Sequence, residues 1–212
     1  MNSENEVVGL VLAAGRASRF GTDKRRARIP DGRTLLEASL ANAAEAFNEL
    51  LLVVRDGDTV ADLRLPPQVR TIYTPLAERG LGASLAAGAE ALASHPAKAL
   101  AVLLGDMPWI RPETCAQLIG AASASHIVQP HHDGQPGHPV LFGRAFWPAL
   151  RELDGDEGAR SLIRRYHAHY LQVDVVDPGI LLDVDRPTDL KVQPAKVRPA
   201  TAAAVTSRPA RS

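Results

Sequence analysis

Cysteine, aromatic residues and net charge are all scarce in this sequence of 212 residues. The single cysteine, Cys115, cannot form an internal disulfide, and alone it does not indicate a zinc cluster. Aromatic residues make up 4% of the chain, too few to suggest platforms that stack on nucleic-acid bases. The 24 basic and 24 acidic residues cancel, so no overall charge attracts nucleic acid or an anionic membrane.

The length and hydropathy of the chain indicate one globular domain. Hydrophobic residues make up 45% of it and charged residues 23%, ordinary proportions for a soluble protein with a buried core. No apolar run reaches the roughly 18 residues of a transmembrane helix, and the first residues, MNSENE, are unlike a signal peptide. We therefore expect a cytoplasmic protein without a membrane or nucleic-acid partner. Residues 1–193 form the expected domain, and residues 194–212, rich in Pro, Ala, Thr and Ser, form an expected disordered tail.

Short apolar runs alternate with helical patterns along the chain. The spacing is that of βαβ units, which predicts an α/β domain with a mostly parallel sheet. Ligands of such sheets bind beyond the carboxyl ends of strands, so the loops after Leu12 and Leu104 are the expected site. The expected strands are residues 7–12, 50–54, 69–73, 99–104, 127–129, 139–142, 170–175 and 180–184. The expected helices are residues 35–48, which follow a capping box at Thr34 and Glu37, then 81–94, 111–122, 144–153 and 159–166, and one that begins at Pro187.

The loop after the first strand, LAAGRASRFGTDK from Leu12 to Lys24, has the composition of a phosphate-binding loop. Its small residues let the backbone approach a ligand closely, and Arg19 and Lys24 supply positive charge. The spacing fits neither a P-loop nor the GxGxxG motif. Seven basic residues in positions 16–33 face only two acids of the same segment. We interpret this cluster as serving a bound triphosphate rather than nucleic acid; the alternative is a solvated surface loop.

Acidic residues follow two other apolar segments. Asp106 ends the run ALAVLLGD, where a carboxylate suits a Mg²⁺ ligand that faces a phosphate, or else a turn before the next helix. If the alternation of the expected strand 180–184 continues by one residue, Asp183 and Asp185 point to the same side, which favours a place beside Asp106. Two acids that converge on a basic loop are typical of a metal–triphosphate site. The alternative for this pair is a solvated strand end.

Two further patterns are weaker. The segment GASLA, residues 82–86, nearly spells a nucleophile elbow, but Ala86 replaces the last glycine and no buried strand precedes it. A serine hydrolase is therefore disfavoured. His131, His132, Asp133 and His138 lie in a Gly- and Pro-rich stretch whose spacing matches no zinc pattern, so a polar loop is the favoured interpretation.

Six ordered motifs resemble one family over residues 7–192. The segment LAAGRASRFGTDK resembles the LAAGx[GS]xR[MF]GxxK signature of nucleotidyltransferases with the MobA-like fold, although Ala17 stands at the usual Gly or Ser. After Lys24 the family usually continues with Leu-Leu, whereas this chain has Arg25-Arg26. The run from GHPVLF through GDEGAR is similar to the molybdenum cofactor cytidylyltransferase branch. The other motifs are GASL (82–85), GDMP (105–108), GHPVLF (137–142), GDEGAR (155–160) and DVDRPTDL (183–190).

The resemblance implies a three-layer α/β fold with a Rossmann-like nucleotide-binding N-terminal half, like that of nucleotide-diphospho-sugar transferases. It implies Mg²⁺-dependent transfer of CMP from CTP to a phosphorylated acceptor, molybdopterin, with release of pyrophosphate. By the same resemblance, Ala14 favours CTP over GTP. The implied roles are triphosphate binding by Arg19 and Lys24; catalysis and metal binding by Asp106, with Asp183 and Asp185 as further metal ligands; nucleotide binding by Leu12, Ala13, Ala14, Gly15, Gly82 and Ser84; and contact with the acceptor by His138 and Asp156.

Two alternatives remain open at this point. The acceptor is another phosphorylated small molecule, such as a sugar or alcohol phosphate, or the chain is a nucleotide-binding partner or chaperone of a molybdenum enzyme without turnover of its own.

Overall fold

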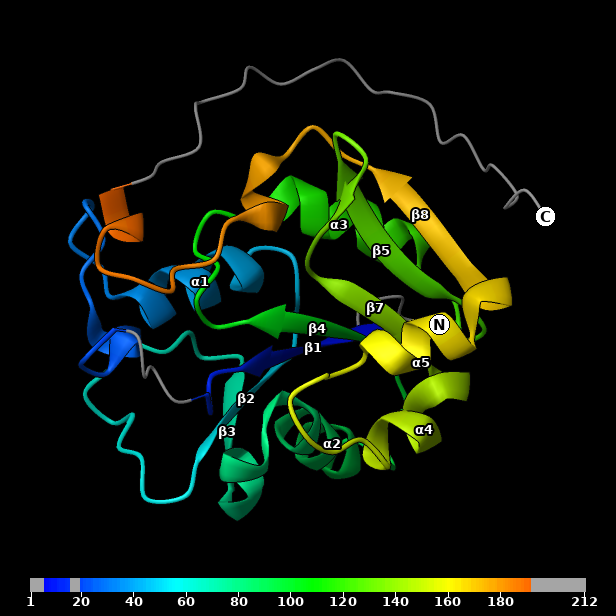
Figure 1. Cartoon of the computed structure of the whole chain (residues 1–212), viewed down its shortest axis with the longest axis horizontal. Helices are drawn as coiled ribbons and strands as arrows, with labels where there is room; N and C mark the ends of the chain where they lie inside the picture. Colours follow the sequence, from blue (N-terminus) through cyan, green and yellow to red (C-terminus); the bar gives the residue numbers. More distant parts are fainter. Residues whose placement is uncertain (1–5, 16–19, 192–212) are drawn as a thin grey trace.

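The structure, a computed structural model, describes residues 6–15 and 20–191. The expected tail, residues 194–212, and the expected triphosphate ligand Arg19 lie outside the described residues. Within the described part, one eight-stranded sheet has the order β3-β2-β1-β4-β7-β5-β6, and β8 pairs with β5 (Figure 1). The strands are β1 (Val7–Leu12), β2 (Leu50–Arg55), β3 (Val69–Thr74), β4 (Ala99–Leu104), β5 (Ile127–His132), β6 (Gln135–Pro136), β7 (Val140–Gly143) and β8 (Tyr170–Asp174).

The first four strands are parallel to one another, as the sequence predicts. β7 runs antiparallel to both β4 and β5, and β8 is parallel to β5. The carboxyl ends of β1 and β4 are adjacent, because Leu12 pairs with Leu104. This register brings the two loops that the sequence singles out to the same edge of the sheet.

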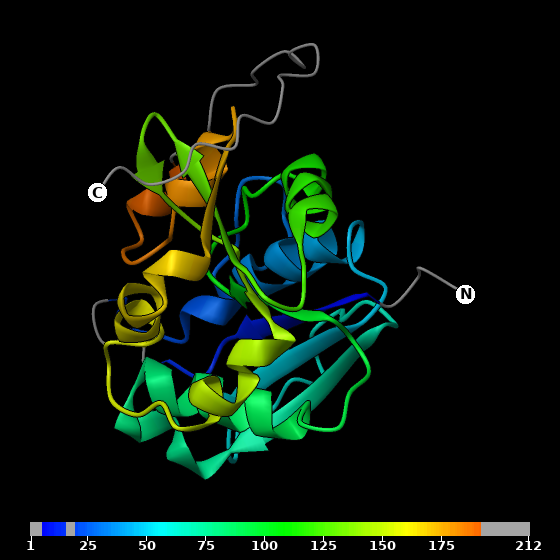
Figure 2. The same ribbon diagram turned by 90° about the vertical axis from the view of Figure 1, so that its right-hand side faces the viewer.

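Helices cover both faces of the sheet, which confirms the three-layer α/β fold (Figures 1 and 2). Alternate residues of β1 and β2 enter two separate apolar clusters, as expected for strands buried on both sides. The first cluster is covered by α1 (Leu35–Ala44) and α3 (Pro112–Ala121), where Cys115 is buried. The second is covered by α2 (Leu81–Ala91), α4 (Trp147–Arg151) and α5 (Arg160–Arg165). No helix of residues 6–15 and 20–191 is long and apolar enough to cross a membrane.

The predicted capping box is present at the start of α1. The Glu37 amide donates to Thr34 Oγ1 at 3.2 Å, and the Thr34 amide donates to Glu37 Oε2 at 2.8 Å. The helix ends at Ala44 rather than near residue 48. At this end the Ala43 carbonyl accepts from the amides of both Ala46 and Phe47, and the Phe47 ring is buried in the core.

The predicted strand at residues 180–184 is wrong. Residues Pro178–Leu181 form a 3-10 helix whose N-cap is Asp177, and residues 182–185 are irregular. Pro178 begins this turn because its fixed φ suits the first helical position. The helix expected from Pro187 is also wrong, since only a single 3-10 turn, Asp189–Lys191, is present. The strand-face argument that placed Asp183 and Asp185 together therefore does not hold.

Candidate active site

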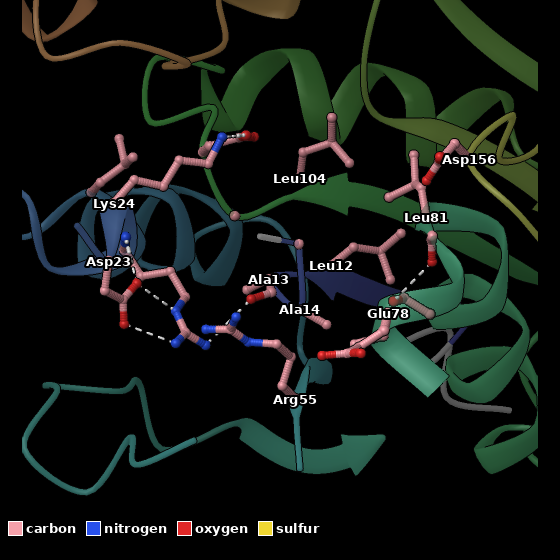
Figure 3. Close-up of a pocket in the computed structure, with 18 of the residues that line it drawn as sticks. Leu12, Ala13, Ala14, Asp23, Lys24, Arg55, Glu78, Leu81, Leu104 and Asp156 are labelled. Carbon is pink, nitrogen blue, oxygen red and sulfur yellow. Dashed lines mark hydrogen bonds and ion pairs between the residues drawn. The ribbon is translucent and has the colours of Figure 1, made fainter. Parts of the chain in front are cut away.

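A cleft of about 770 Å³ opens at the carboxyl ends of β1 and β4 (Figure 3). Its size is in the range of small-molecule sites in proteins. The loop after β1 lines it with Ala13, Ala14 and Gly15, and the end of β4 contributes Asp106. Figure 3 shows Lys24 and Asp156 on opposite sides of it. Of the residues expected from the sequence, the lining contains Leu12, Ala13, Ala14, Gly15, Lys24, Ser84, Asp106 and Asp156.

Lys24 is bound to the acidic end of this cleft. Its Nζ donates to Asp106 Oδ2 at 2.6 Å and to Asp185 Oδ1 at 3.2 Å, and also to the Val184 carbonyl at 3.1 Å. Burial by itself would lower the pKa of Lys24. The two carboxylates outweigh this effect, because their negative charges and the hydrogen bonds that they accept raise the pKa. Lys24 is therefore a protonated side chain that lies between two acids from distant parts of the chain.

The carboxylates at this end suit a hard divalent cation. Within the described residues, Oδ1 of Asp106 is buried and has no hydrogen-bond partner, as expected for an oxygen that a metal would use. Asp183 is exposed as a residue, but its carboxyl is partly desolvated, and this desolvation together with the charge of Asp106 raises its pKa. No group of three or more His, Cys, Asp or Glu side chains in residues 6–15 and 20–191 forms a ready-made metal cage. One or two carboxylates plus phosphate oxygens, however, are a normal Mg²⁺ environment.

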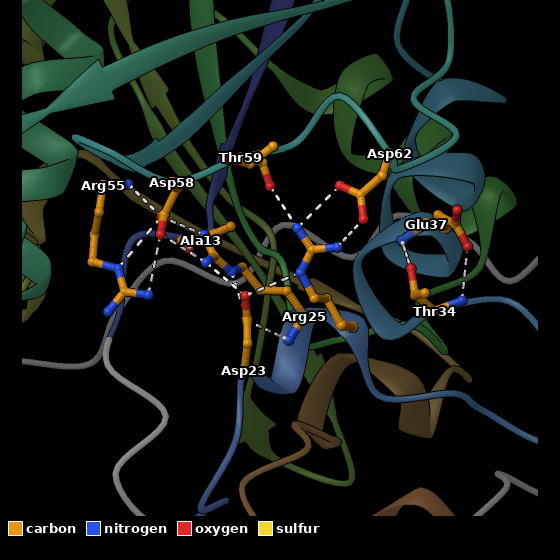
Figure 4. A network of polar contacts seen from close by, with 10 residues as sticks. Ala13, Asp23, Arg25, Thr34, Glu37, Arg55, Asp58, Thr59 and Asp62 are labelled. Carbon is orange, nitrogen blue, oxygen red and sulfur yellow. Dashed lines mark hydrogen bonds and ion pairs between the residues drawn. The ribbon is translucent and has the colours of Figure 1, made fainter.

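The neighbouring basic residues are held by carboxylates of another loop (Figure 4). Arg25 is buried and donates to Asp58 at 2.5 and 2.9 Å, to Asp23 at 2.8 Å, and to the Ala13 carbonyl at 3.4 Å. Burial would raise the pKa of Asp58, but hydrogen bonds from Arg25 and Arg55 lower it to about 2. Arg26 pairs with Asp62.

The expectation that the whole basic cluster faces a triphosphate does not hold. Arg33 pairs with Asp31 at 2.6 Å, and Arg28 donates to the Gly32 carbonyl at 2.5 Å. Of the cluster's described members, Lys24 and Arg25 line the cleft. The sequence analysis counted only the acids of residues 16–33. It therefore missed Asp58 and Asp62, which follow β2 and pair with Arg25 and Arg26.

The far wall of the cleft is made by the start of α2 and residues 154–158. Ser84 Oγ donates to the Gly80 carbonyl at 3.3 Å, and the Gly82 amide donates to the Gly155 carbonyl at 2.8 Å. Gly82 does not line the cleft; a Cβ there would lie 2.7 Å from the Asp154 carbonyl oxygen. Its role in the structure is to allow this close packing, which holds Asp156 at the cleft wall.

Arg55 and Glu78 also line the cleft and were not expected from the sequence. Arg55 is the last residue of β2, and Glu78 lies in the 3-10 helix Pro75–Arg79 after β3. Motif spacing gives no indication of either residue. The rule that ligands bind beyond strand carboxyl ends, applied to β2 as well as β1 and β4, would have pointed to Arg55.

His138 does not line the cleft. Its Nδ1 is buried and has no hydrogen-bond partner in the described part of the chain, and its amide donates to the Ile180 carbonyl at 3.0 Å. Burial lowers the pKa of the imidazole, although the charge of nearby Asp106 opposes that shift. The structure therefore places His138 behind the acidic end of the cleft rather than in its wall.

The profile of the MobA-like NTP transferase domain matches residues 9–170. The chain belongs to this family. The purine catabolism protein PucB of Bacillus subtilis is 28% identical over 86% of this MobA-like chain and 93% of its own length. A probable molybdenum cofactor guanylyltransferase of Chloroflexus aggregans is 29% identical over 87% and 91%. The molybdenum cofactor cytidylyltransferase of Escherichia coli is 25% identical over 85% and 91%.

The MobA-like fold is also found in a solved structure of Rv0371c from Mycobacterium tuberculosis. It is 31% identical, with a TM-score of 0.74, over 88% of this chain and 96% of that one. A second structure of Rv0371c is a complex with manganese. Two of these relatives are molybdenum cofactor nucleotidyltransferases by name.

Proposed function

We propose that this MobA-like nucleotidyltransferase transfers CMP from CTP to a phosphorylated acceptor and releases pyrophosphate. The observation that carries the proposal is the cleft at the ends of β1 and β4, which combines a small-residue loop with Lys24 and the half-buried Asp106. An oxygen of the acceptor phosphate attacks the α-phosphorus of the nucleotide, and the bond from that phosphorus to the bridging oxygen of the β-phosphate breaks. The electron pair of that bond leaves with pyrophosphate.

The residues position the substrates and offset charge. An acceptor phosphate is already ionised at pH 7, so no general base is needed, and catalysis depends on alignment and electrostatics. Lys24, with Arg19 from the same loop, binds the triphosphate and offsets the charge that develops on pyrophosphate. The amide of Gly15 and the hydroxyl of Ser84 hold the nucleotide, while Asp156 acts on the acceptor side; among the described residues, the structure gives His138, which lies behind the cleft, no contact there.

The proposed metal is Mg²⁺, held by Asp106 with Asp183 or Asp185. The unpartnered Oδ1 of Asp106 supports this assignment, and so does the manganese complex of Rv0371c. A bound divalent cation neutralises phosphate charge and fixes the geometry of the phosphates. Asp106 occupies a suitable place because it directly follows β4, a rigid central strand.

The proposed preference for CTP over GTP rests on Ala14. The resemblance implies Gly-Gly in guanylyltransferases of this family where this chain has Ala14-Gly15. Ala14 lines the cleft, and the proposal is that its methyl group narrows the space for the base. Overpacking at a rigid contact costs about 1–3 kcal/mol, or roughly 5- to 150-fold in affinity. Calorimetry with CTP and GTP tests this on the wild type and on Ala14→Gly. Equal affinities or a GTP preference in the wild type would contradict the cytidylyl assignment, and an unchanged ratio in Ala14→Gly would contradict the methyl argument.

The proposed acceptor is molybdopterin, because two of the similar proteins are molybdenum cofactor nucleotidyltransferases by name. Release of pyrophosphate is measured with CTP, Mg²⁺ and each of several acceptors: molybdopterin, a sugar phosphate and an alcohol phosphate. We expect turnover with molybdopterin. If turnover occurs only with another acceptor, that acceptor takes the place of molybdopterin in the proposal. Tight CTP binding without turnover on any acceptor would indicate a nucleotide-binding partner of a molybdenum enzyme.

A further inference from the structure

The ammonium group of Lys24 has no hydrogen left to donate. A lysine ammonium carries three N–H donors, and the structure gives it three acceptors: Asp106 Oδ2, Asp185 Oδ1 and the Val184 carbonyl, at 2.6 to 3.2 Å. The side chain of Lys24 is only 17% exposed. Lys24 therefore cannot bind a phosphate oxygen unless it gives up at least one of these partners.

The same contacts occupy one oxygen of each carboxylate, Asp106 Oδ2 and Asp185 Oδ1, and leave Asp106 Oδ1 without a partner among the described residues. Asp106 and Asp185 are two of the three acids proposed as metal ligands, and Lys24 occupies the space between them. A divalent cation that bound both acids beside the ammonium would bring positive charges together in a half-buried place, where they repel strongly. The metal and the Lys24 ammonium are thus alternative partners of the two acids.

The backbone around Lys24 is anchored on both sides, so a change of partners by Lys24 requires movement of its side chain and not of the backbone. Asp23 caps the short 3-10 helix Lys24–Arg26 by accepting from the Arg25 amide at 3.1 Å. Arg25 is itself fixed by Asp58. Rotation of the Lys24 side chain is then the simplest way to move its charge from the carboxylates to a phosphate bound in the same cleft.

We propose that Lys24 is an exchangeable counter-cation, and that the site takes its divalent cation only together with a nucleotide. Without nucleotide, Lys24 neutralises Asp106 and Asp185; the phosphates of an arriving metal–nucleotide complex draw Lys24 away, and the metal replaces it on the carboxylates. The ligand of the site is therefore the metal–nucleotide chelate rather than the free ion. The part of this inference that concerns the nucleotide rests on the proposed function. The competition between Lys24 and Mn²⁺ for the two carboxylates does not depend on it.

The test measures binding of Mn²⁺ alone, by electron paramagnetic resonance, to the full-length protein without nucleotide. We expect weak binding to the wild type and at least tenfold tighter binding to Lys24→Met, because the substitution leaves two carboxylates without their counter-ion. The matched control is Lys98→Met, which removes a lysine paired with Glu6 in a salt bridge on the surface; it should bind Mn²⁺ as the wild type does. Equal or weaker binding by Lys24→Met overturns the proposal.

A second measurement needs no variant. In the wild type, CTP or GTP should raise the affinity for Mn²⁺ at least tenfold, and Mn²⁺ should raise the affinity for the nucleotide by the same factor, because linkage is reciprocal. Tight Mn²⁺ binding without nucleotide, unchanged by its addition, overturns the proposal even if Lys24→Met fails to fold. Failure of the proposed function looks different: no nucleotide binds with metal present, while the comparison of Lys24→Met with the wild type in Mn²⁺ alone still decides the inference.

Discussion

The carboxylate of Asp58 holds together two arginines of the cleft, and its removal is a direct test of the network in Figure 4. Asp58 accepts from both Nη atoms of Arg25 and, at 2.9 to 3.3 Å, from the amide and side chain of Arg55. These contacts lower its pKa from 3.8 to about 2. A shift of this size corresponds to about 2 kcal/mol of folding stability. The side chain is only 12% exposed, so solvent screens this contribution little.

We expect Asp58→Asn to lower the free energy of unfolding at pH 7 by about 2 kcal/mol, which for a domain of this size lowers the Tm by about 4–8 °C. Because the folded-state pKa is depressed, the contribution is complete above about pH 4 and is lost as the pH falls toward 2. The difference between the wild type and Asp58→Asn should therefore shrink in that window.

The assay is urea unfolding of both proteins at several pH values between 7 and 3. The matched control is Asp62→Asn, since Asp62 pairs with Arg26 but is 58% exposed, and exposed pairs contribute little. A destabilisation by Asp58→Asn that is the same at every pH, or no larger than that of Asp62→Asn, would refute the reasoning.

Three further substitutions have defined outcomes. Asp106→Ala should abolish turnover while circular dichroism shows an intact fold, and near wild-type Mg²⁺-dependent activity would make Asp106 a turn residue only. Gly80→Ala should destabilise the protein by about 2–4 kcal/mol, because φ is +110° and the new Cβ would lie 2.4 Å from Asp156 Oδ1; the control is Gly120→Ala in α3, where the added Cβ has open space, and it should leave the Tm unchanged or raise it, because alanine favours a helix over glycine. Asp177→Asn should cost about 2–4 kcal/mol in urea unfolding, since this carboxylate is buried and accepts three hydrogen bonds from groups of Arg111, Thr114 and Gly179; a cost below about 0.5 kcal/mol would contradict this.

The three inner parallel strands, β1, β2 and β4, were predictable because they are buried on both faces. The apolar runs at Val7–Leu12 and Ala99–Leu104 have the bounds that the sequence predicts. The error at residues 180–184 has a tertiary cause. The alternation of apolar and acidic residues there imitates a strand, but the Val184 amide donates to the Asp106 carbonyl instead of to a neighbouring strand.

Part of the cleft lining was predictable, but Arg55 and Glu78 were missed, Gly82 and His138 do not line the cleft, and the contacts between the residues could not be predicted. Lys24 and Asp106 follow from the resemblance, yet they are 82 positions apart and no local pattern shows that they touch. Arg25 was grouped with phosphate ligands because its partner Asp58 lies 33 positions away. Counting charges along the sequence thus overestimates the unpaired positive charge of a loop when the counter-ions lie in a different loop, here the one after β2.

Transfer of label from CTP labelled at the α-phosphorus tests whether the protein moves CMP from CTP to a phosphorylated acceptor. The wild type is incubated with labelled CTP, Mg²⁺ and molybdopterin, and the acceptor is separated from free nucleotide. We expect the label to appear on the acceptor in a one-to-one ratio with pyrophosphate, and both products to vanish without the divalent cation. Folded protein that binds CTP but transfers no label to molybdopterin or to any other phosphorylated acceptor would contradict it.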